Sequence, residues 1–166
     1  MKIILIGFMG AGKTSVGKKL AEKLELAYVD MDQLIITQSG RTSDSEIFDQ
    51  DGEVFFRELE TAVAKDLQKI KDAIIATGGG IVLNKLNIDY LKNDGVVVFL
   101  KNSFETSQKR INNNHIPPLF RDGEKAKALY DFRLPLYIHY ADVIIETDNK
   151  TIEHVTNEIM EKIKNL

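Results

Sequence analysis

The residues near the amino end of this sequence have types and spacing that suit the binding of phosphate. Residues 7–14 read GFMGAGKT, which fits the pattern G-x-x-x-x-G-K-[ST]. Gly10 and Gly12 carry no side chains, so main-chain N–H groups can converge on phosphate oxygens. Lys13 supplies a positive charge, and the Thr14 hydroxyl is placed to bind Mg²⁺. The pattern therefore predicts a loop that holds a polyphosphate.

Two carboxylates follow the next apolar run of the chain. Asp30 and Asp32 flank Met31 just past Leu26–Val29, and in open α/β sheets ligands collect beyond the carboxyl ends of strands. One carboxylate can hold Mg²⁺ through water, and the other can accept a hydrogen bond from a reacting hydroxyl. The alternative is a helix N-cap followed by an acid in the first turn, with Asp32 also able to serve as the cap.

The glycine triplet Gly78–Gly80 follows a third apolar run. Three consecutive glycines cost conformational entropy, which favours close approach of the backbone to a ligand over a plain turn. In proteins with this type of phosphate loop the third strand normally carries an acidic partner of Mg²⁺, but Ala73–Thr77 contains no acid. We expect Asp30 to replace it.

Two arginines have neighbours that suit the binding of a carboxylate. Arg57 and Glu60 are three residues apart in a helical pattern, and a guanidinium held by a carboxylate suits bidentate capture of a substrate carboxylate. On these residues alone, an exposed ion pair within the helix is the favoured alternative. Arg133 precedes Pro135 inside another helical pattern, where the proline is expected to kink the helix or begin a new one. Core packing of residues 134–137 is the alternative there.

Short continuous apolar runs alternate with helical patterns along the chain. The runs are Ile3–Ile6, Leu26–Val29, Ala73–Ala76, Val96–Leu100 and Val143–Ile145. Such runs are typical of parallel strands buried on both faces and joined by helices, so we predict an α/β fold. The clearest helix follows Gly52. Its predicted apolar stripe consists of Phe55, Leu59, Ala62, Val63, Leu67 and Ile70.

Two segments interrupt this alternation. The chain from Met31 to Gly52 is long and polar enough to form a small subdomain. Residues 112–123 read NNNHIPPLFRDG and contain two prolines, so we expect no regular helix there. This stretch lies where a mobile lid could close over a nucleotide, although an ordinary surface loop fits its composition equally well.

Composition restricts the classes of function. The chain has 166 residues, 43% hydrophobic and 28% charged, which suits one globular domain. A net charge of −3 gives no electrostatic case for binding nucleic acid. There is no cysteine, which excludes disulfides and thiol chemistry, and no apolar run is long enough for a membrane span. The first predicted strand leaves no room for a cleaved targeting peptide, so we expect a cytoplasmic protein.

Together these motifs resemble the shikimate kinase family, small P-loop kinases of the nucleoside-monophosphate-kinase type. The resemblance runs from Lys2 to about Lys150 and rests on residues 7–17, 30–32, 56–60, 78–80 and 133–137. It implies one domain over residues 1–166, a three-layer sandwich with a five-stranded parallel sheet in the order 2-3-1-4-5 flanked by helices. It also implies a substrate-binding subdomain at about 31–60 and a lid at about 111–124.

The resemblance implies transfer of the γ-phosphoryl group of ATP to the 3-hydroxyl of shikimate, in the route to chorismate and the aromatic amino acids. Shikimate and ATP are then the partners, Mg²⁺ is the cofactor, and the protein is a monomer. By resemblance, Lys13, Asp32 and Asp30 are catalytic, with Asp32 on the reacting hydroxyl, while Thr14 and, through water, Asp30 hold Mg²⁺. The implied ATP-binding residues are Gly10, Ala11, Gly12, Lys13, Thr14, Ser15, Arg110 and Lys150. The implied shikimate-binding residues are Asp32, Arg57, Glu60, Gly78, Gly79, Gly80, Arg133, Phe48 and Phe56.

One position departs from the family pattern. The family's lid usually carries an arginine before Pro-Leu-Leu, where this chain has Pro117. We expect His115, Arg121 or Arg110 to supply the missing charge. Two rival functions are another small-molecule P-loop kinase, acting on gluconate or a nucleotide, and a regulator that binds ligand without transferring phosphate. A nucleotide kinase is expected to have an arginine-rich lid, which this chain lacks.

Overall fold

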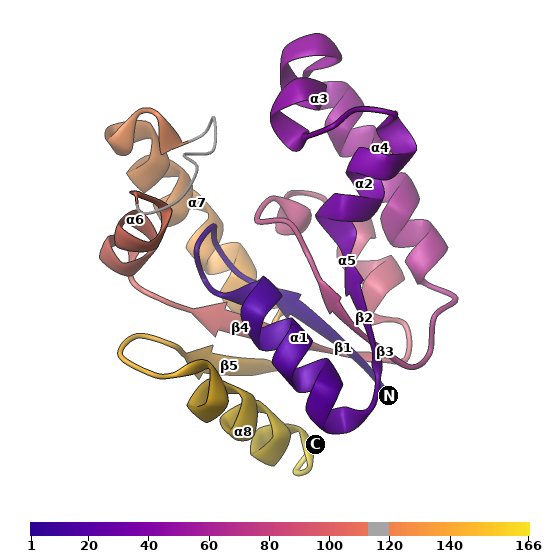
Figure 1. The fold of residues 1–166 in the computed structure, drawn as a ribbon, viewed down its shortest axis with the longest axis vertical. Coiled ribbons are helices and arrows are strands. Elements are labelled where there is room, and N and C mark those ends of the chain that lie inside the picture. Colours follow the sequence, from indigo (N-terminus) through magenta and orange to yellow (C-terminus); the bar gives the residue numbers. More distant parts are fainter. Residues whose placement is uncertain (113–119) are drawn as a thin grey trace.

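A five-stranded parallel sheet forms the centre of the molecule (Figure 1). The computed structural model describes residues 1–112 and 120–166. The strands are β1 (Lys2–Ile6), β2 (Ala27–Asp30), β3 (Ala73–Ala76), β4 (Gly95–Lys101) and β5 (Val143–Glu146). Their order is β2-β3-β1-β4-β5. The five predicted strands and the order implied by the resemblance are confirmed, with strand ends shifted by one residue at most.

Helices cover both faces of this sheet. They are α1 (Lys13–Leu24), α2 (Met31–Ser39), α3 (Asp44–Gln50), α4 (Gly52–Leu67), the 3₁₀ turn η1 (Ile81–Leu83), α5 (Lys85–Lys92), α6 (Phe104–Asn112), α7 (Gly123–Tyr140) and α8 (Ile152–Ile163). Within the described parts of the chain, none of them is both long and apolar enough to cross a membrane.

The alternation of side chains along β1 separates two cores. Ile3 and Leu5 belong to a cluster with apolar residues of α1 and α8, whereas Ile4 and Ile6 belong to a cluster with residues of α4, α5 and α7. Successive side chains of a strand point to opposite faces, so the two clusters lie on opposite sides of the sheet. The expected three-layer arrangement is confirmed.

The buried face of α4 differs from the predicted stripe. Val63 and Leu67 are buried as expected, but Phe55 and Ala62 are exposed and Ile70 lies beyond the end of the helix. The face that packs inward instead carries Phe56, Glu60, Val63, Ala64 and Leu67. The prediction assigned Glu60 to the exposed face of the helix because glutamate is polar. Since Glu60 is in fact buried, the buried face is rotated by one residue from the predicted one.

Helix α7 continues through its proline. It runs unbroken from Gly123 to Tyr140 with Pro135 inside, so the expectation of a new helix there is wrong. Its buried residues are Ala126, Tyr130, Arg133 and Tyr137, which recur at the three- and four-residue spacing of one helix face. This spacing turns Arg133 toward the interior of the molecule.

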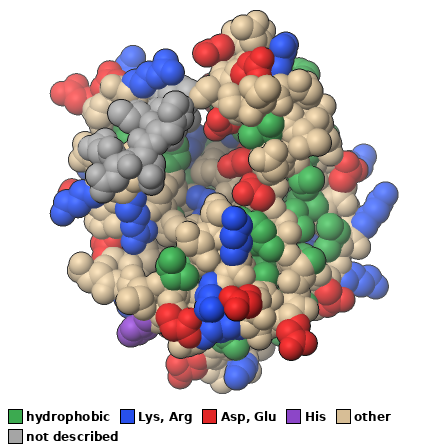
Figure 2. Space-filling view, viewed as in Figure 1, with side chains coloured by type: hydrophobic (Ala, Val, Ile, Leu, Met, Phe, Trp, Pro, Cys, Tyr) green, Lys and Arg blue, Asp and Glu red, His purple; other side chains and the backbone are tan. Residues whose placement is uncertain are grey.

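The elements beyond the carboxyl ends of the strands form two groups. Figure 1 shows α2 and α3 with the start of α4 on one side, and α6 with the start of α7 on the other. Figure 2 shows the surface hollowed between the two groups, with acidic and basic side chains at the hollow. The segment from Met31 to Gly52, in which we expected a subdomain, folds into α2 and α3.

Candidate active site

The predicted phosphate loop joins β1 to α1 and leaves the start of α1 open. Gly10 and Gly12 adopt φ angles of 75° and 90°, which favour glycine. Helix α1 begins at Lys13, and its N-cap residue makes no side-chain hydrogen bond to the first turn. The uncapped amides and the helix dipole therefore favour an anion at this end. The Lys13 ammonium lies over the loop, donating to the carbonyl oxygens of Gly7 (2.6 Å) and Phe8 (3.0 Å).

The two acids after β2 have different positions. Asp30 is the N-cap of α2 and accepts a hydrogen bond from the backbone N–H of Gln33 at 3.2 Å. Asp32 lies in the first turn of that helix and makes no cap. The N-cap alternative thus describes the local geometry correctly for Asp30. Because Asp32 does not cap the helix, its carboxylate remains able to contact a ligand in the hollow between the two groups of helices.

Burial changes the acidity of two charged groups near the loop. It raises the pKa of the Asp32 carboxyl to about 6, against the opposing effect of Lys13 and with a further rise caused by Asp30. It also lowers the pKa of the Lys13 ammonium to about 8, which Asp32 partly offsets. Near neutral pH, Asp32 is therefore mostly ionised and still basic enough to accept a proton from a bound hydroxyl.

The predicted substrate residues surround one cavity of about 90 Å³, which we call the Asp32 cavity. All nine line it: Asp32, Phe48, Phe56, Arg57, Glu60, Gly78, Gly79, Gly80 and Arg133. They come from α2, α3, α4, α7 and the turn after β3, so the fold alone brings them together. Met9 and Asp44 also line the cavity. Sequence reasoning missed both, because Met9 occupies an unspecified position of the phosphate-loop pattern, Asp44 belongs to no motif, and only the tertiary fold places them at this cavity.

Two arginines line this cavity, Arg57 from α4 and Arg133 from α7. The Arg133 side chain is 3% exposed, and burial lowers the pKa of its guanidinium. Arg57 Nη1 donates to Glu60 Oε1 at 3.0 Å, and Glu60 is 1% exposed, so the exposed ion pair considered above is wrong. Among the described residues, the Nε atoms of both arginines are buried without a hydrogen-bond partner. Buried donors of this kind call for an acceptor, which a bound anion would provide.

The glycine triplet provides space for charged side chains. An added Cβ on Gly78 would lie 2.6 Å from Asp32 Oδ1, and one on Gly80 would overlap the Arg57 guanidinium. None of the three has a positive φ, so backbone conformation does not require glycine here. Glycine is favoured at residues 78 and 80 because Asp32 and Arg57 lie against the turn, whereas a Cβ on Gly79 would meet only ordinary contacts.

A tyrosine of α7 fixes the same turn. The Tyr137 hydroxyl donates to the carbonyl oxygen of Gly79 at 2.5 Å, and the side chain is 1% exposed. Sequence reasoning assigned residues 134–137 only to core packing. The four-residue spacing from Arg133 was the available signal, because it places both side chains on one face of α7.

Most predicted ATP residues lie around a second cavity. This cavity of about 200 Å³, the Lys150 cavity, contains Ala11, Gly12, Ser15, Arg110 and Lys150 in its lining. Arg110 Nη1 donates to the carbonyl oxygen of Gly10 at 2.8 Å, which ties α6 to the phosphate loop. Lys150 forms an ion pair with Glu158 at 2.6 Å. Gly10, Lys13 and Thr14 belong to the loop and the first turn of α1, between the two cavities.

The donors near the loop fit a magnesium ion held mainly by phosphate. The Thr14 side chain is exposed, and Asp30 lies at the carboxyl end of β2. In the described parts of the chain no group of three or more histidine, cysteine, aspartate or glutamate side chains could hold a metal. Because Mg²⁺ usually keeps several waters and binds through one or two protein groups and substrate phosphates, this sparse donor set suits it.

Part of the predicted lid lies outside the described residues, including His115 and Pro117. The described end of the lid is anchored. The Phe120 ring is 7% exposed and stacks on Phe104, with 5.9 Å between ring centroids, and it also contacts Phe8 of the phosphate loop. Arg121, which follows, is exposed.

Comparison with known proteins agrees with this geometry. The family model described as Shikimate kinase matches residues 9–164. A shikimate kinase of Caldanaerobacter subterraneus subsp. tengcongensis is 42% identical over 95% of this chain and 93% of its own, and one of Caldicellulosiruptor bescii is 40% identical over 95% and 92%. The solved structure of shikimate kinase from Acinetobacter baumannii in complex with shikimate has a TM-score of 0.93 and 36% identity over 99% of this chain and 93% of that one. The chain belongs to the shikimate kinase family.

Proposed function

We propose that this protein transfers the γ-phosphoryl group of ATP to the 3-hydroxyl of shikimate, giving shikimate 3-phosphate and ADP. Family membership and the likeness to a kinase solved with shikimate support the reaction. The observation that carries the proposal for this chain is the Asp32 cavity. It joins the buried Arg133, the half-buried Arg57, a carboxylate of raised pKa and a glycine turn next to a phosphate loop.

The arginines suit the carboxylate of the acceptor. Arg57 and Arg133 both carry a buried Nε without a partner among the described residues. A carboxylate between them would accept hydrogen bonds from both guanidinium groups, and bonds between charged groups of this kind are strong and orienting. Phe48 and Phe56, whose ring centroids lie 4.7 Å apart, offer an apolar wall for a carbon ring.

Asp32 suits the reacting hydroxyl. The Asp32 carboxylate lies against Gly78, the first residue of the glycine triplet, and its raised pKa makes it a better proton acceptor. In phosphoryl transfer most of the catalysis is positioning and electrostatic stabilisation. Asp32 therefore orients the hydroxyl toward the phosphate and takes its proton as the new bond forms.

The phosphate loop and Lys13 suit the triphosphate. Lys13 already lies over the loop, where its ammonium can exchange carbonyl oxygens of Gly7 and Phe8 for phosphate oxygens. Mg²⁺ would be held by the Thr14 hydroxyl and, through water, by Asp30. When bound, it neutralises charge on the phosphates. The Lys150 cavity, including Arg110, is the candidate place for the adenine.

The remaining expectations extend this proposal. The chain acts as a cytoplasmic monomer of one domain, with a substrate-binding subdomain at about 31–60 and a lid at about 111–124 that closes to exclude water. A basic residue, His115, Arg121 or Arg110, replaces the charge that a lid arginine provides elsewhere in the family.

A coupled assay of ADP release tests the function and its rivals. With ATP and Mg²⁺, the protein should release ADP rapidly with shikimate and only at background with gluconate or nucleoside monophosphates. Release with gluconate or a nucleotide but not with shikimate would show that the acceptor is wrong. Binding of shikimate without ADP release would favour the regulator.

A further inference from the structure

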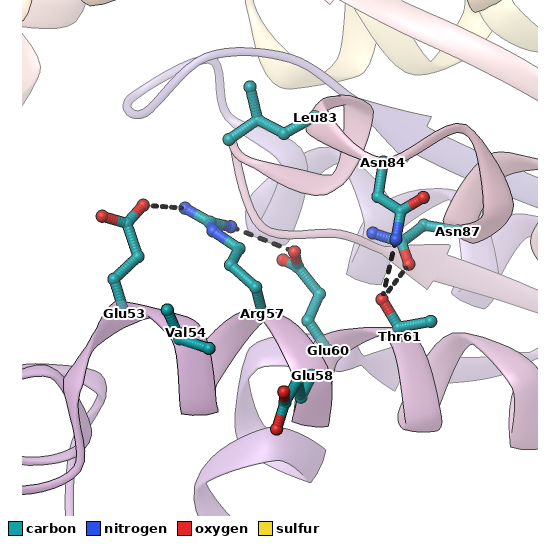
Figure 3. A pocket seen from close by; sticks show the side chains of 9 residues that line it. All are labelled: Glu53, Val54, Arg57, Glu58, Glu60, Thr61, Leu83, Asn84 and Asn87. Atoms are coloured by element: carbon teal, nitrogen blue, oxygen red, sulfur yellow. Dashed lines mark hydrogen bonds and ion pairs between the residues drawn. The ribbon is translucent and has the colours of Figure 1, made fainter.

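Arg57 has two carboxylate partners on its own helix (Figure 3). Its Nη1 lies 3.0 Å from Glu60 Oε1, and its Nη2 lies 3.5 Å from Glu53 Oε1. Residues three and four apart face each other along a helix, so α4 holds the guanidinium between one acid of the preceding turn and one of the following turn. Both terminal nitrogens of Arg57 are thus paired before any substrate binds.

The two carboxylates differ in how firmly they are held. Glu60 is 1% exposed and burial raises the pKa of its carboxyl, with Arg57 opposing that rise. The Glu53 side chain is 60% exposed, and its contact with Arg57 is the longer one. Exposed ion pairs contribute little to stability, whereas separating a buried pair leaves an uncompensated charge. Glu53 is therefore the partner that can leave.

The nitrogen bound by Glu53 is one that a substrate carboxylate needs. Arg57 Nε is buried and has no partner among the described residues. A carboxylate that binds a guanidinium side-on uses two neighbouring nitrogens. Since Glu60 holds Nη1, the remaining pair is Nε and Nη2. The incoming carboxylate would thus bring a second negative charge to Nη2, the nitrogen that Glu53 already contacts, and like charges at one donor repel.

A second cavity offers room for the displaced side chain. This cavity of about 670 Å³, the Asn87 cavity, is lined by Glu53, Glu58, Thr61 and Asn87 together with Arg57 and Glu60. Glu53 lines only this cavity, whereas Arg57 and Glu60 line both this one and the Asp32 cavity. Of these two cavities, Glu53 lines only the one that lacks the predicted substrate residues of α2, α3 and α7, so its side chain can move into the Asn87 cavity without entering the Asp32 cavity.

We propose that Glu53 determines specificity by occupying Arg57 in the free protein and leaving when the substrate carboxylate binds, an inference that rests on the proposed function. A small anion that contacts Arg57 alone only takes the place of the Glu53 carboxylate on that guanidinium, so its net binding free energy is small. A ligand that also reaches Arg133 gains a second guanidinium, which is buried and whose Nε has no partner among the described residues. The contact with Glu53 therefore favours a carboxylate that spans both arginines over simple anions.

The test compares the wild-type protein with Glu53→Gln, which keeps the size of the side chain and removes its charge. Because an exposed ion pair is weak, we expect the KM for shikimate to fall about two- to fivefold. The kcat and the KM for ATP should stay unchanged. The dissociation constant of shikimate, titrated without ATP, should fall by the same factor. Acetate should become a stronger competitive inhibitor.

Glu58→Gln is the matched control. Glu58 lies on the same helix, lines the same cavity and is exposed, and among the described residues it makes no ion pair with Arg57. The Glu58→Gln substitution removes one negative charge, as Glu53→Gln does, but it removes no contact with Arg57. Its KM for shikimate should therefore remain near that of the wild-type protein. An equal fall in both variants would assign the effect to net charge and overturn the proposal.

An unchanged or raised KM in Glu53→Gln would also overturn it, since a rise would mean that Glu53 holds Arg57 in place for the substrate. Failure of the proposed function has a different signature. If the proposed function is wrong, the wild-type protein binds shikimate without releasing ADP. The dissociation constants of shikimate for Glu53→Gln and Glu58→Gln can still be compared by titration.

Discussion

The carboxylate of Asp32 fills the space beside Gly78 that any larger residue would need. An added Cβ on Gly78 would lie 2.6 Å from Asp32 Oδ1, and the nearest atoms to it all belong to Asp32. The glycine and the acid are distant in sequence but form one unit. Since Asp32 is the flexible partner, a side chain at residue 78 should displace the carboxylate and leave the turn in place.

Gly78→Ala is therefore expected to reduce turnover without unfolding the protein. A catalytic group displaced by about 1 Å can cost about 10²-fold in rate, so kcat should fall by about that factor. Steady-state kinetics and thermal unfolding measure the two effects. Gly123→Ala is the control for thermal unfolding, because the nearest atom to its added Cβ, Gln108 Nε2, is 3.8 Å away. If the kcat of Gly78→Ala is near that of the wild-type protein, a side chain at residue 78 does not displace the Asp32 carboxylate.

Arg57→Ala and Arg133→Ala should weaken shikimate binding and leave ATP binding nearly unchanged. Each removes a cation from the lining of the Asp32 cavity and none from the lining of the Lys150 cavity. A hydrogen bond to a charged group contributes about 1.5–3 kcal/mol, so we expect the dissociation constant for shikimate to rise about 10- to 100-fold. Isothermal titration with each substrate measures this. A comparable loss of ATP affinity would contradict the assignment.

Asp32→Asn should stabilise the ligand-free protein at alkaline pH while reducing its activity. Burial raises the pKa of the carboxyl from about 3.8 to about 6 on folding. The stability that this group contributes is thus complete below about pH 4 and is lost as the pH rises through about 6. At pH 8 the ionised carboxylate is a cost, and its removal should raise the free energy of unfolding by up to about 3 kcal/mol.

Urea unfolding at pH 8 and pH 4, without nucleotide or metal, measures this difference. The stabilisation should be present at pH 8 and absent at pH 4. Asp44→Asn removes a charge from the same cavity and serves as the control. If Asp32→Asn is destabilised equally at both pH values, the raised pKa does not explain the behaviour of Asp32.

The charge missing from the lid should come from a basic residue of α6 or the lid. Arg110 is already bonded to the Gly10 carbonyl of the phosphate loop. We expect alanine at one of Arg110, Arg121 or His115 to lower kcat by about 10²-fold, because a cation on a transferring phosphoryl group contributes strongly to the rate. Single-turnover kinetics of the three variants identify the residue. Unchanged rates in all three would place the charge elsewhere.

The sequence predicts the strands and the phosphate loop well because both depend on local pattern. Ala73–Ala76 was predicted to the residue, since a continuous apolar run bounded by polar residues has few alternatives. Strand order came from the family resemblance and not from periodicity. The exposed positions of Phe55 and Ala62 were missed because adjacent apolar residues allow two assignments of the buried face, and the buried Glu60 decides between them.

In the site, too, local sequence patterns predict some features and only the tertiary structure shows the others. Motifs identify Asp32, Arg57 and Arg133, and of their contacts they predict only the pairing of Arg57 with Glu60. The bond from Tyr137 to Gly79 depends on how α7 packs against the turn after β3, so the sequence does not report it. The spacing of Glu53 and Arg57 allows their contact within α4, but only the structure shows that it forms.

The most direct test of the whole account identifies the product. The protein is incubated with ATP, Mg²⁺ and shikimate, and phosphorus NMR follows the phosphate, with Lys13→Ala as the inactive control. We predict a phosphate monoester on the 3-hydroxyl of shikimate, formed in step with ADP by the wild-type protein and not by the variant. Release of inorganic phosphate in place of that ester, or equal turnover by Lys13→Ala, would contradict the account.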